Sequence, residues 1–516
     1  MSNTPSFDPL RRRVLQGGAA AGALTLLRTP VYAQSAAPRM ALVIGNARYP
    51  HSPLDNPVND AEAIAGQLKA TGFDVSIQLD TGRETLIKAI VDYVTRLAAR
   101  KAVGLFYFAG HGAQLAWRNY LIPVDAVIRS QSDIAPQSVE LNILLQGLGK
   151  AANPMNVVIL DACRDNPFGK AMPLDQKGLS QFDAPLGSLL AYATSPGNVA
   201  SDGAGANGLY TESLLAELKV PGAKIEDVFK RVRLAVRRRS NGRQVPWEST
   251  SLEEDFYFQP PKTIRKLSDT EAGKLFEEEL AIWERIKGAT EPAPLEDYLR
   301  NHPSGVFSEV AQFRLDHVLS LRGEKKIVAA DAPDNPFSRG TGRLDIRYNI
   351  GDRYQYREVD PDTKAEKRTY TFRVTAVSDT DVTFNDGRLV IDLLGNSRKQ
   401  PDGDEVTQSQ YYVPEYSVGK KWTTRYKIVR PDGRVFYGEY VFRVTGRGMV
   451  SVPAGEFNAF HVEGNGFGDE ARSRLKLDYW IAPDVARFVL RTYQRINKAG
   501  TITNHERTEL VAYPRR

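Results

Sequence analysis

The sequence predicts an α/β domain built on a mainly parallel sheet with helices on both faces, then a small helical module and an antiparallel β domain. Two short apolar runs, at 103–108 and 156–160, are rich in aromatic or β-branched residues, as fully buried strands are. Apolar residues at helical spacing separate such runs, which is typical of right-handed β–α–β crossovers. Beyond residue 341 the apolar residues alternate and turn residues recur, which indicates antiparallel strands.

The α/β part is predicted to span residues 39–260. We expect its strands at 40–45, 73–79, 103–108, 156–160 and 188–194. We expect its helices near 58–68, 86–97, 138–148, 209–219 and 225–239. Residues 166–187 are hydrophilic and contain three prolines, so we expect a loop there.

The remaining chain is predicted to hold three further segments. Residues 262–325 are predicted to form a helical hairpin module that is too small to be stable alone. Residues 326–341 are predicted to form a linker. Residues 342–516 are predicted to form an antiparallel β domain, either a sandwich or an open barrel, with no catalytic constellation. The six-residue sequences at 370–375 and 440–445 are nearly identical, which indicates either a duplicated hairpin or a coincidence of β patterning.

The first 33 residues are predicted to be an export signal. Arg11, Arg12 and Arg13 precede an apolar run of 11 residues, which is too short to span a bilayer, and an A-x-A-like cleavage site ends at Ala33. The arginines resemble a twin-arginine signal, which implies a bacterial chain that folds before export to the periplasm or beyond. An ordinary secretory signal and an uncleaved anchor remain alternatives. No membrane span is expected after the signal is removed.

Charge and cysteine content exclude some function classes. Loss of residues 1–33 removes four arginines and one aspartate, so the net charge falls from +6 to +3, which is too small to indicate nucleic-acid binding. Cys163 is the only cysteine, so the chain has no internal disulfide and folds independently of the redox compartment.

Two chemically versatile side chains follow strands of the predicted sheet. His111 comes shortly after the strand at 103–108, and Cys163 after the strand at 156–160. Because open α/β sheets place their sites at the carboxyl ends of strands, we expect the two to meet there. A nearby imidazole favours the thiolate and protonates a leaving amine, so the pair indicates a cysteine nucleophile. A structural histidine and a small buried cysteine are the alternative.

Three short motifs surround these residues, each after a predicted strand: YFAGHG at 107–112, DACR at 161–164 and YATSPGNV at 192–199. His111 and Cys163 are 52 positions apart, close to the separation of about 50 found in caspases. On these residues, positions 39–260 resemble the caspase and metacaspase family of cysteine peptidases. The resemblance implies a caspase-like sheet and a cysteine endopeptidase activity.

The resemblance also implies roles for single residues. Cys163 is the nucleophile and His111 the acid and base. The backbone N–H groups of Gly112 and Cys163 form an oxyanion hole. Ser195, in the third motif, and Trp247, near the rim of the cleft, are expected to contact substrate, although a tryptophan is as often part of a core.

Acidic residues stand where caspases proper have other types. Asp161 replaces a glutamine two residues before the nucleophile, and Asp202 stands about where an arginine grips an acidic substrate. Asp60 matches the metacaspase position whose carboxylate faces the same pocket. We therefore expect cleavage of protein or peptide substrates after Arg or Lys. The alternatives are a helix N-terminal charge for Asp60 and a turn aspartate for Asp202.

Self-processing and metal dependence are weaker expectations. The loop 166–187 lies where caspases are cut between subunits, and it offers Lys170 and Lys177 as cleavage sites. Metacaspases often need calcium, but Asp125 and Asp133 are scattered, so we expect no cofactor and consider calcium dependence doubtful.

The sequence leaves rival functions open. The peptidase domain could be inactive or minor in an envelope binding protein whose β domain acts on an unidentified partner. A self-processing structural precursor is a third hypothesis.

Overall fold

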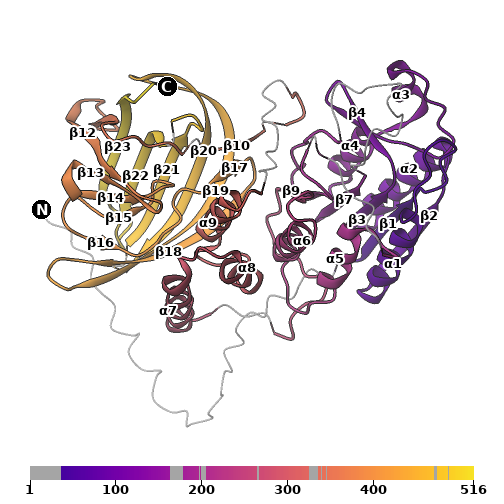
Figure 1. The fold of residues 1–516 in the computed structure, drawn as a ribbon, viewed down its shortest axis with the longest axis horizontal. Helices are drawn as coiled ribbons and strands as arrows, with labels where there is room; N and C mark the ends of the chain where they lie inside the picture. The colour runs from indigo at the N-terminus through magenta and orange to yellow at the C-terminus, as the bar shows by residue number, and fades with distance from the viewer. Residues whose placement is uncertain are drawn as a thin grey trace, which may run out of the picture.

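The computed structural model describes residues 37–162, 178–196, 198, 205–263, 267–324, 335–338, 340–344, 346–469, 473–485 and 487–515. Figure 1 shows an α/β part at one end of the molecule, in indigo to magenta, and a β-barrel at the other, in orange to yellow. A group of helices lies between them. The order of a mixed α/β sheet, helices and antiparallel strands confirms the fold class predicted from the sequence.

The α/β part is built on a sheet that has, within the described residues, six strands in the order β2-β1-β3-β7-β8-β9. The first five run parallel and β9 is antiparallel to β8. Their bounds are Arg39–Gly45 (β1), Phe73–Leu79 (β2), Val103–Ala109 (β3), Asn156–Asp161 (β7), Ser188–Tyr192 (β8) and Trp247–Thr250 (β9). Every residue of β3 and β7 is buried, which explains why both read as unbroken apolar runs.

Helices cover both faces of this sheet. One group contains α1 (Pro57–Ala70), α5 (Leu209–Glu217) and α6 (Ile225–Arg239). In this group α5 contacts both α1 and α6. The other contains α2 (Arg83–Arg100) and α4 (Leu141–Ala151). Each of these helices lies within a few residues of its predicted position, because its apolar residues recur at the helical period.

A small second sheet follows β3 directly. It consists of β4 (Gly112–Leu115), β5 (Arg118–Leu121) and β6 (Val139–Glu140), with the short helix α3 (Gln131–Gln137) beside it. This sheet matters for function because β4 begins at the residue after His111.

The middle segment consists, where described, of three helices: α7 (Asp269–Ile286), α8 (Pro292–Asn301) and α9 (Ser308–Leu321). Their apolar faces form one core around Trp283 and Phe307, whose rings stack with centroids 5.9 Å apart. Leu394 from the barrel completes that core. The helices therefore share their hydrophobic core with a neighbouring part of the chain.

The C-terminal strands close into a barrel, where a sandwich or an open barrel was predicted. In the described part of the chain it has twelve antiparallel strands, and pairing of the first with the last closes it. The bounds are Arg353–Val359 (β11), Glu366–Val377 (β12), Asp381–Phe384 (β13), Leu389–Asp392 (β14), Ser397–Lys399 (β15), Glu405–Val406 (β16), Lys421–Val429 (β18), Val435–Val452 (β19), Gly455–Gly468 (β20), Ser473–Ile481 (β21), Phe488–Ile496 (β22) and Ile502–Ala512 (β23). Alternation fixes which side chains face inward but carries no signal for closure.

A separate pair of strands, β10 (Thr341–Arg343) and β17 (Glu415–Ser417), lies beside the barrel. The three parts of the molecule are joined by partly buried ion pairs. Arg237 of α6 contacts Asp316 of α9 at 2.6 Å, and Glu309 of α9 contacts Lys420 at 2.7 Å. Across the described residues, no helix combines the length and the apolar character that crossing a membrane requires.

Candidate active site

His111 is held rigidly just beyond the end of β3. Gly110 adopts a φ of +154°, and a Cβ atom there would meet the Tyr49 hydroxyl at 2.7 Å, so the turn requires glycine. The backbone N–H of His111 donates to that hydroxyl at 2.9 Å, and the two rings pack with centroids 4.4 Å apart. With only 3% of its surface exposed, the imidazole has one defined orientation.

The backbone carbonyl of Ser52 determines which ring nitrogen carries the proton. Nε2 of His111 lies 2.7 Å from that oxygen, which can only accept a hydrogen bond. Nε2 therefore donates, and in the neutral ring Nδ1 is the basic nitrogen. The sequence gives no signal for this contact, because every residue type offers the same carbonyl.

Strand register brings the segments of the two predicted catalytic residues together. Ala109 of β3 is the register partner of Asp161 of β7, and the N–H of Gly110 donates to the Asp161 carbonyl at 3.3 Å. A Cβ atom on Gly112 would lie 2.8 Å from the carbonyl oxygen of Ala162, so only glycine permits this approach. Cys163 lies outside the described residues, but it is next in sequence to Ala162.

Two predicted pocket carboxylates are buried near each other. Asp161 ends β7 with 3% of its surface exposed, and its Oδ2 accepts a hydrogen bond from the Thr211 hydroxyl at 2.9 Å. Asp60, in the first turn of α1, is fully buried. Its Oδ1 accepts hydrogen bonds from the backbone of Gly208 and the side chain of Asn207, both at 2.9 Å. Asp60 thus connects α1 to the start of α5.

The hydroxyl of Tyr107 lies within reach of both charges. It shares a hydrogen bond of 2.6 Å with Thr211, which also donates to Asp161. Burial raises the pKa of Tyr107 well above its ordinary value, and the charges of Asp161 and Asp60 add to that rise. The two carboxylates therefore place negative charge around this buried hydroxyl. Tyr107 and Thr211 were not predicted as site residues.

Two expected substrate contacts are buried in the structure. The hydroxyl of Ser195 donates to the carbonyl of Val245 at 2.9 Å. Trp247 is 6% exposed and packs on Tyr192, with the ring centroids 5.7 Å apart. Both side chains thus contact the framework of the sheet. Asp202, Lys170 and Lys177 lie outside the described residues.

The two aspartates considered for calcium have local backbone roles. Asp125 accepts a hydrogen bond from the backbone N–H of Arg83 at 2.9 Å, at the start of α2. Asp133 completes a capping box with Ser130 at the start of α3, and hydrogen bonds from the Arg129 backbone and from Ser130 lower its pKa. Neither contact gathers the two carboxylates into one site.

A strap of residues 335–341 holds the segment that leads from the loop to β8. The amide of Asn335 donates to the carbonyl of Gln181 at 2.7 Å, and Gln181 donates to Thr341 at 3.0 Å. Phe337 packs on Phe182, with centroids 4.9 Å apart. This part of the predicted linker is thus packed against the α/β part.

The same segment contacts the small sheet next to His111. The amide of Asn119 on β5 donates to the Ser180 carbonyl at 2.8 Å and accepts from the Ser180 N–H at 2.6 Å. Leu179 lies beside Gly112, 3.0 Å from the position of a Cβ there. A continuous chain of contacts therefore connects β10, beside the barrel, to the residue after His111.

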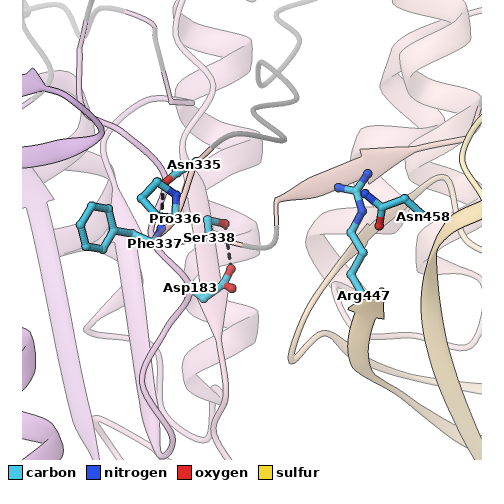
Figure 2. Close-up of a pocket in the computed structure, with 7 residues that line it drawn as sticks. All are labelled: Asp183, Asn335, Pro336, Phe337, Ser338, Arg447 and Asn458. Atoms are coloured by element: carbon cyan, nitrogen blue, oxygen red, sulfur yellow. Dashed lines mark hydrogen bonds between the residues drawn. The ribbon is translucent and has the colours of Figure 1, made fainter. Parts of the chain in front are cut away.

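A polar cavity of about 380 Å³ lies between this strap and the barrel. Figure 2 shows Ser338 bonded to Asp183 on one side and Arg447 and Asn458 of the barrel on the other. His111 and the pocket carboxylates do not line it.

Comparison with known proteins agrees with this geometry. The family model described as the caspase domain matches residues 38–257. Residues 38–257 are thus similar to caspase domains. This region contains β3, which ends just before His111, and β7, which ends at Asp161, so the resemblance drawn from the three motifs is confirmed.

Two curated relatives extend the comparison. The mucosa-associated lymphoid tissue lymphoma translocation protein 1 homolog of Mus musculus is 28% identical over 163 residues, which cover 31% of this chain and 18% of that protein. The Homo sapiens protein of the same name is 28% identical over 163 residues, covering 31% and 19%. The chain spans less than a fifth of the length of these relatives, and the likeness supports a caspase-family protease.

Proposed function

We propose that the chain is a cysteine endopeptidase that cleaves after Arg or Lys with Cys163 and His111. The observation that carries the proposal is the register of β3 and β7. Residues 111 and 163 each stand two positions beyond the paired residues Ala109 and Asp161. Parallel strands end at the same edge of a sheet, so an imidazole and a thiol at these positions are neighbours.

The fixed ring of His111 supplies the proton chemistry. With Nε2 donating to Ser52, Nδ1 accepts the thiol proton of Cys163, and the thiolate attacks the scissile carbonyl carbon. His111 then gives that proton to the leaving amine as the C–N bond breaks and a thioester remains. Water, deprotonated by the same ring, hydrolyses the thioester and frees the thiol.

The backbone at Gly112 supports the oxyanion step. Its close approach to Ala162 brings its main chain next to the residue that precedes the nucleophile. Backbone N–H groups of Gly112 and Cys163 then stabilise the negative oxygen of the tetrahedral intermediate. One such donor is worth about 3–4 kcal/mol.

The buried carboxylates support a basic P1 preference. A guanidinium or ammonium group that enters beside Asp161 and Asp60 gains charge-assisted hydrogen bonds of about 1.5–3 kcal/mol each. An acidic P1 side chain is repelled by the same two charges. Asp202 is proposed as a further acidic contact at the mouth of the pocket.

We further propose export through the twin-arginine signal and self-cleavage at Lys170 or Lys177. Both rest on the sequence, since residues 1–36 and 163–177 lie outside the described structure. Mass analysis of the exported and the incubated protein would locate the mature N-terminus and any cut.

The decisive experiment uses the chain from residue 34 with fluorogenic peptides that differ only at P1. We expect cleavage with Arg or Lys and none with Asp, loss of activity in Cys163→Ala and His111→Ala, and full activity in the control His317→Ala. Acidic preference would refute the specificity. Inactivity on every peptide, with equal labelling of parent and His111→Ala by a basic P1 alkylating probe, would favour the envelope-scaffold function.

A further inference from the structure

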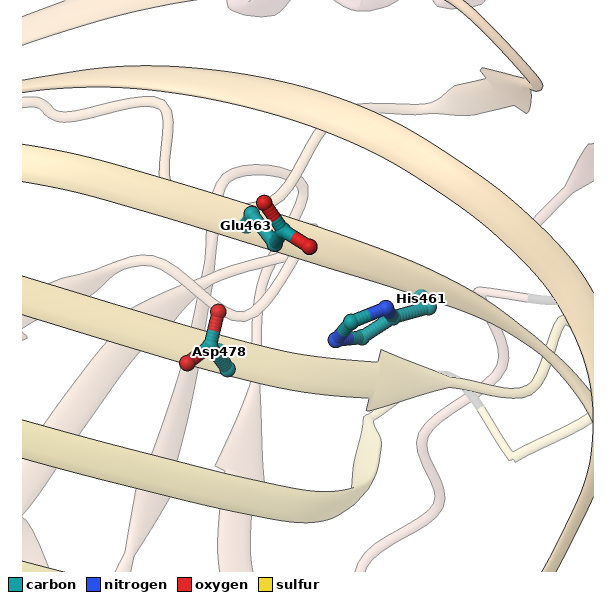
Figure 3. Close-up of side chains that lie close together, drawn as sticks. All are labelled: His461, Glu463 and Asp478. Carbon is teal, nitrogen blue, oxygen red and sulfur yellow. The ribbon is translucent and has the colours of Figure 1, made fainter.

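A group of metal-ligating side chains lies on the outer face of the barrel, outside the caspase-like domain. His461 and Glu463 belong to β20 and Asp478 to β21, and one ligand atom from each lies within 4.8 Å of the others. Figure 3 shows the imidazole and the two carboxylates close together over adjacent strands. Among the described residues, these three form the group of His, Cys, Asp or Glu side chains whose ligand atoms all lie within 4.8 Å of one another.

Register places the two carboxylates directly opposite each other. Glu463 is the register partner of Asp478. The next pair along these strands, Val462 and Tyr479, points inward and is fully buried in the barrel. Like charges that face each other across strands destabilise a sheet. The arrangement therefore carries an electrostatic cost that a bound cation removes.

The surrounding protein compensates this charge only in part. Within the described structure, neither carboxylate takes part in a hydrogen bond or an ion pair. Arg443, the register partner of Glu463, is paired with Glu253 at 3.1 Å.

The ring of His461 is held in an orientation suited to a ligand. Its Nδ1 lies 2.9 Å from the Thr445 hydroxyl, and its face stacks on Trp480 with centroids 4.7 Å apart and planes 16° apart. A register shift of β19 between Val444 and Gly446 makes Thr445 the extra residue of a β-bulge. In the tautomer in which Nδ1–H donates to the Thr445 hydroxyl, Nε2 carries the lone pair that a cation binds, as in many metal-binding histidines.

We propose that Nε2 of His461 and the carboxylates of Glu463 and Asp478 bind one Zn²⁺ ion, with water at the exposed fourth position. One imidazole with two carboxylates suits zinc, whereas Mg²⁺ and Ca²⁺ prefer oxygen ligands alone. Bonds of about 2.1 Å in a tetrahedron bring ligand atoms to about 3.4 Å apart. Small side-chain rotations are enough to close the group from its present distances.

The test measures metal binding without reference to peptidase activity. The chain from residue 34 with Cys163→Ala, which removes the thiol as a competing ligand, is titrated calorimetrically with Zn²⁺, Mg²⁺ and Ca²⁺. We expect one Zn²⁺ per chain, and an affinity at least 100-fold lower in His461→Ala or Asp478→Asn. Thr445→Val, which removes only the supporting hydroxyl, should weaken binding about 10- to 100-fold.

His505→Ala is the matched control, because this histidine lies on β23 of the same barrel and contacts Gln494. It should bind Zn²⁺ like the parent, and all variants should keep the parental circular dichroism spectrum. Equal Zn²⁺ affinity in parent and His461→Ala, no Zn²⁺ binding at all, or equal affinity for Ca²⁺ would each overturn the proposal. Zinc anomalous scattering from a soaked crystal, centred on these three residues, would support it directly.

Discussion

The parallel sheet and the barrel assemble polar groups in different ways. At the carboxyl end of the parallel sheet, backbone contacts do most of the positioning: the Ser52 carbonyl orients His111, and Gly112 lies against Ala162. On the outer face of the barrel, side chains from β19, β20 and β21 meet because their strands are in register. The first site thus depends on main-chain shape and the second on the identity of a few side chains.

This difference determines which substitutions each site tolerates. A substitution that only displaces the backbone at the end of the parallel sheet should abolish peptide cleavage. It should leave the three side chains on the barrel in place. Truncation of one barrel side chain should remove metal binding and leave peptide cleavage unchanged. The predictions below test that contrast, in order of decreasing effect.

Gly112→Ala should have the largest effect. A methyl group there would lie 2.8 Å from the Ala162 carbonyl oxygen, so the backbone must move away from the oxyanion position. We expect kcat to fall about 100- to 1,000-fold, the size of a lost oxyanion donor. Gly149→Ala on α4, where a Cβ meets open space, is the matched control. Parental kcat in Gly112→Ala would remove this glycine from the mechanism.

Asp161→Asn removes a charge and keeps the shape of the side chain. We expect kcat/KM for a P1 arginine peptide to fall about 10- to 100-fold, as for one charge-assisted hydrogen bond. A peptide with citrulline at P1, which is neutral but similar in shape, should lose far less. Asp74→Asn, an exposed partner of Arg100, is the control. An unchanged ratio of arginine to citrulline cleavage would mean that Asp161 is purely structural.

Asp392 should make the barrel more stable in mild acid. Burial raises the pKa of its carboxyl to about 6, above the value of about 3.9 in an unfolded chain. Between these values the folded state binds a proton that the unfolded state does not, so the free energy of unfolding rises as pH falls. From pH 7 to pH 4 the gain is about 2 kcal/mol relative to Asp392→Asn, measured by urea denaturation. A pH-independent difference would contradict it.

Asn335→Ala should have a smaller effect, confined to the strap. It removes the donor to the Gln181 carbonyl at 2.7 Å, which costs about 1 kcal/mol. We expect faster hydrogen exchange of the amides in 179–183 and parental Zn²⁺ binding. Asn301→Ala, at the exposed end of α8, is the control. Unchanged exchange would show that the strap does not restrain this segment.

Much of the caspase-like domain could be predicted from sequence, because its signals are local. The apolar runs before His111 and Cys163 are buried on both faces of a parallel sheet, and such a composition is typical of strands in that position. The motifs lie directly at the ends of those strands, so their order in the chain is also their arrangement along the sheet edge.

The rest depends on contacts that no local pattern encodes. The Ser52 carbonyl is 59 residues from His111 in sequence, and Thr211 is 50 residues from Asp161. In the barrel, alternation predicts that Glu463 and Asp478 face outward, but only the strand register makes them neighbours. Closure of the barrel depends on the pairing of β11 with β23, at opposite ends of that domain.

The contacts of Ser180 and the pairing of β7 with β8 decide what happens to a chain that is cut in its loop. Ser180, downstream of any cut at Lys170 or Lys177, is hydrogen-bonded to Asn119, which lies upstream of it. Both fragments also contribute strands to one sheet, through the pairing of β7 with β8. Such a protein would run as two bands on a denaturing gel and as one particle in gel filtration, so processing would change its chain count without releasing a subunit.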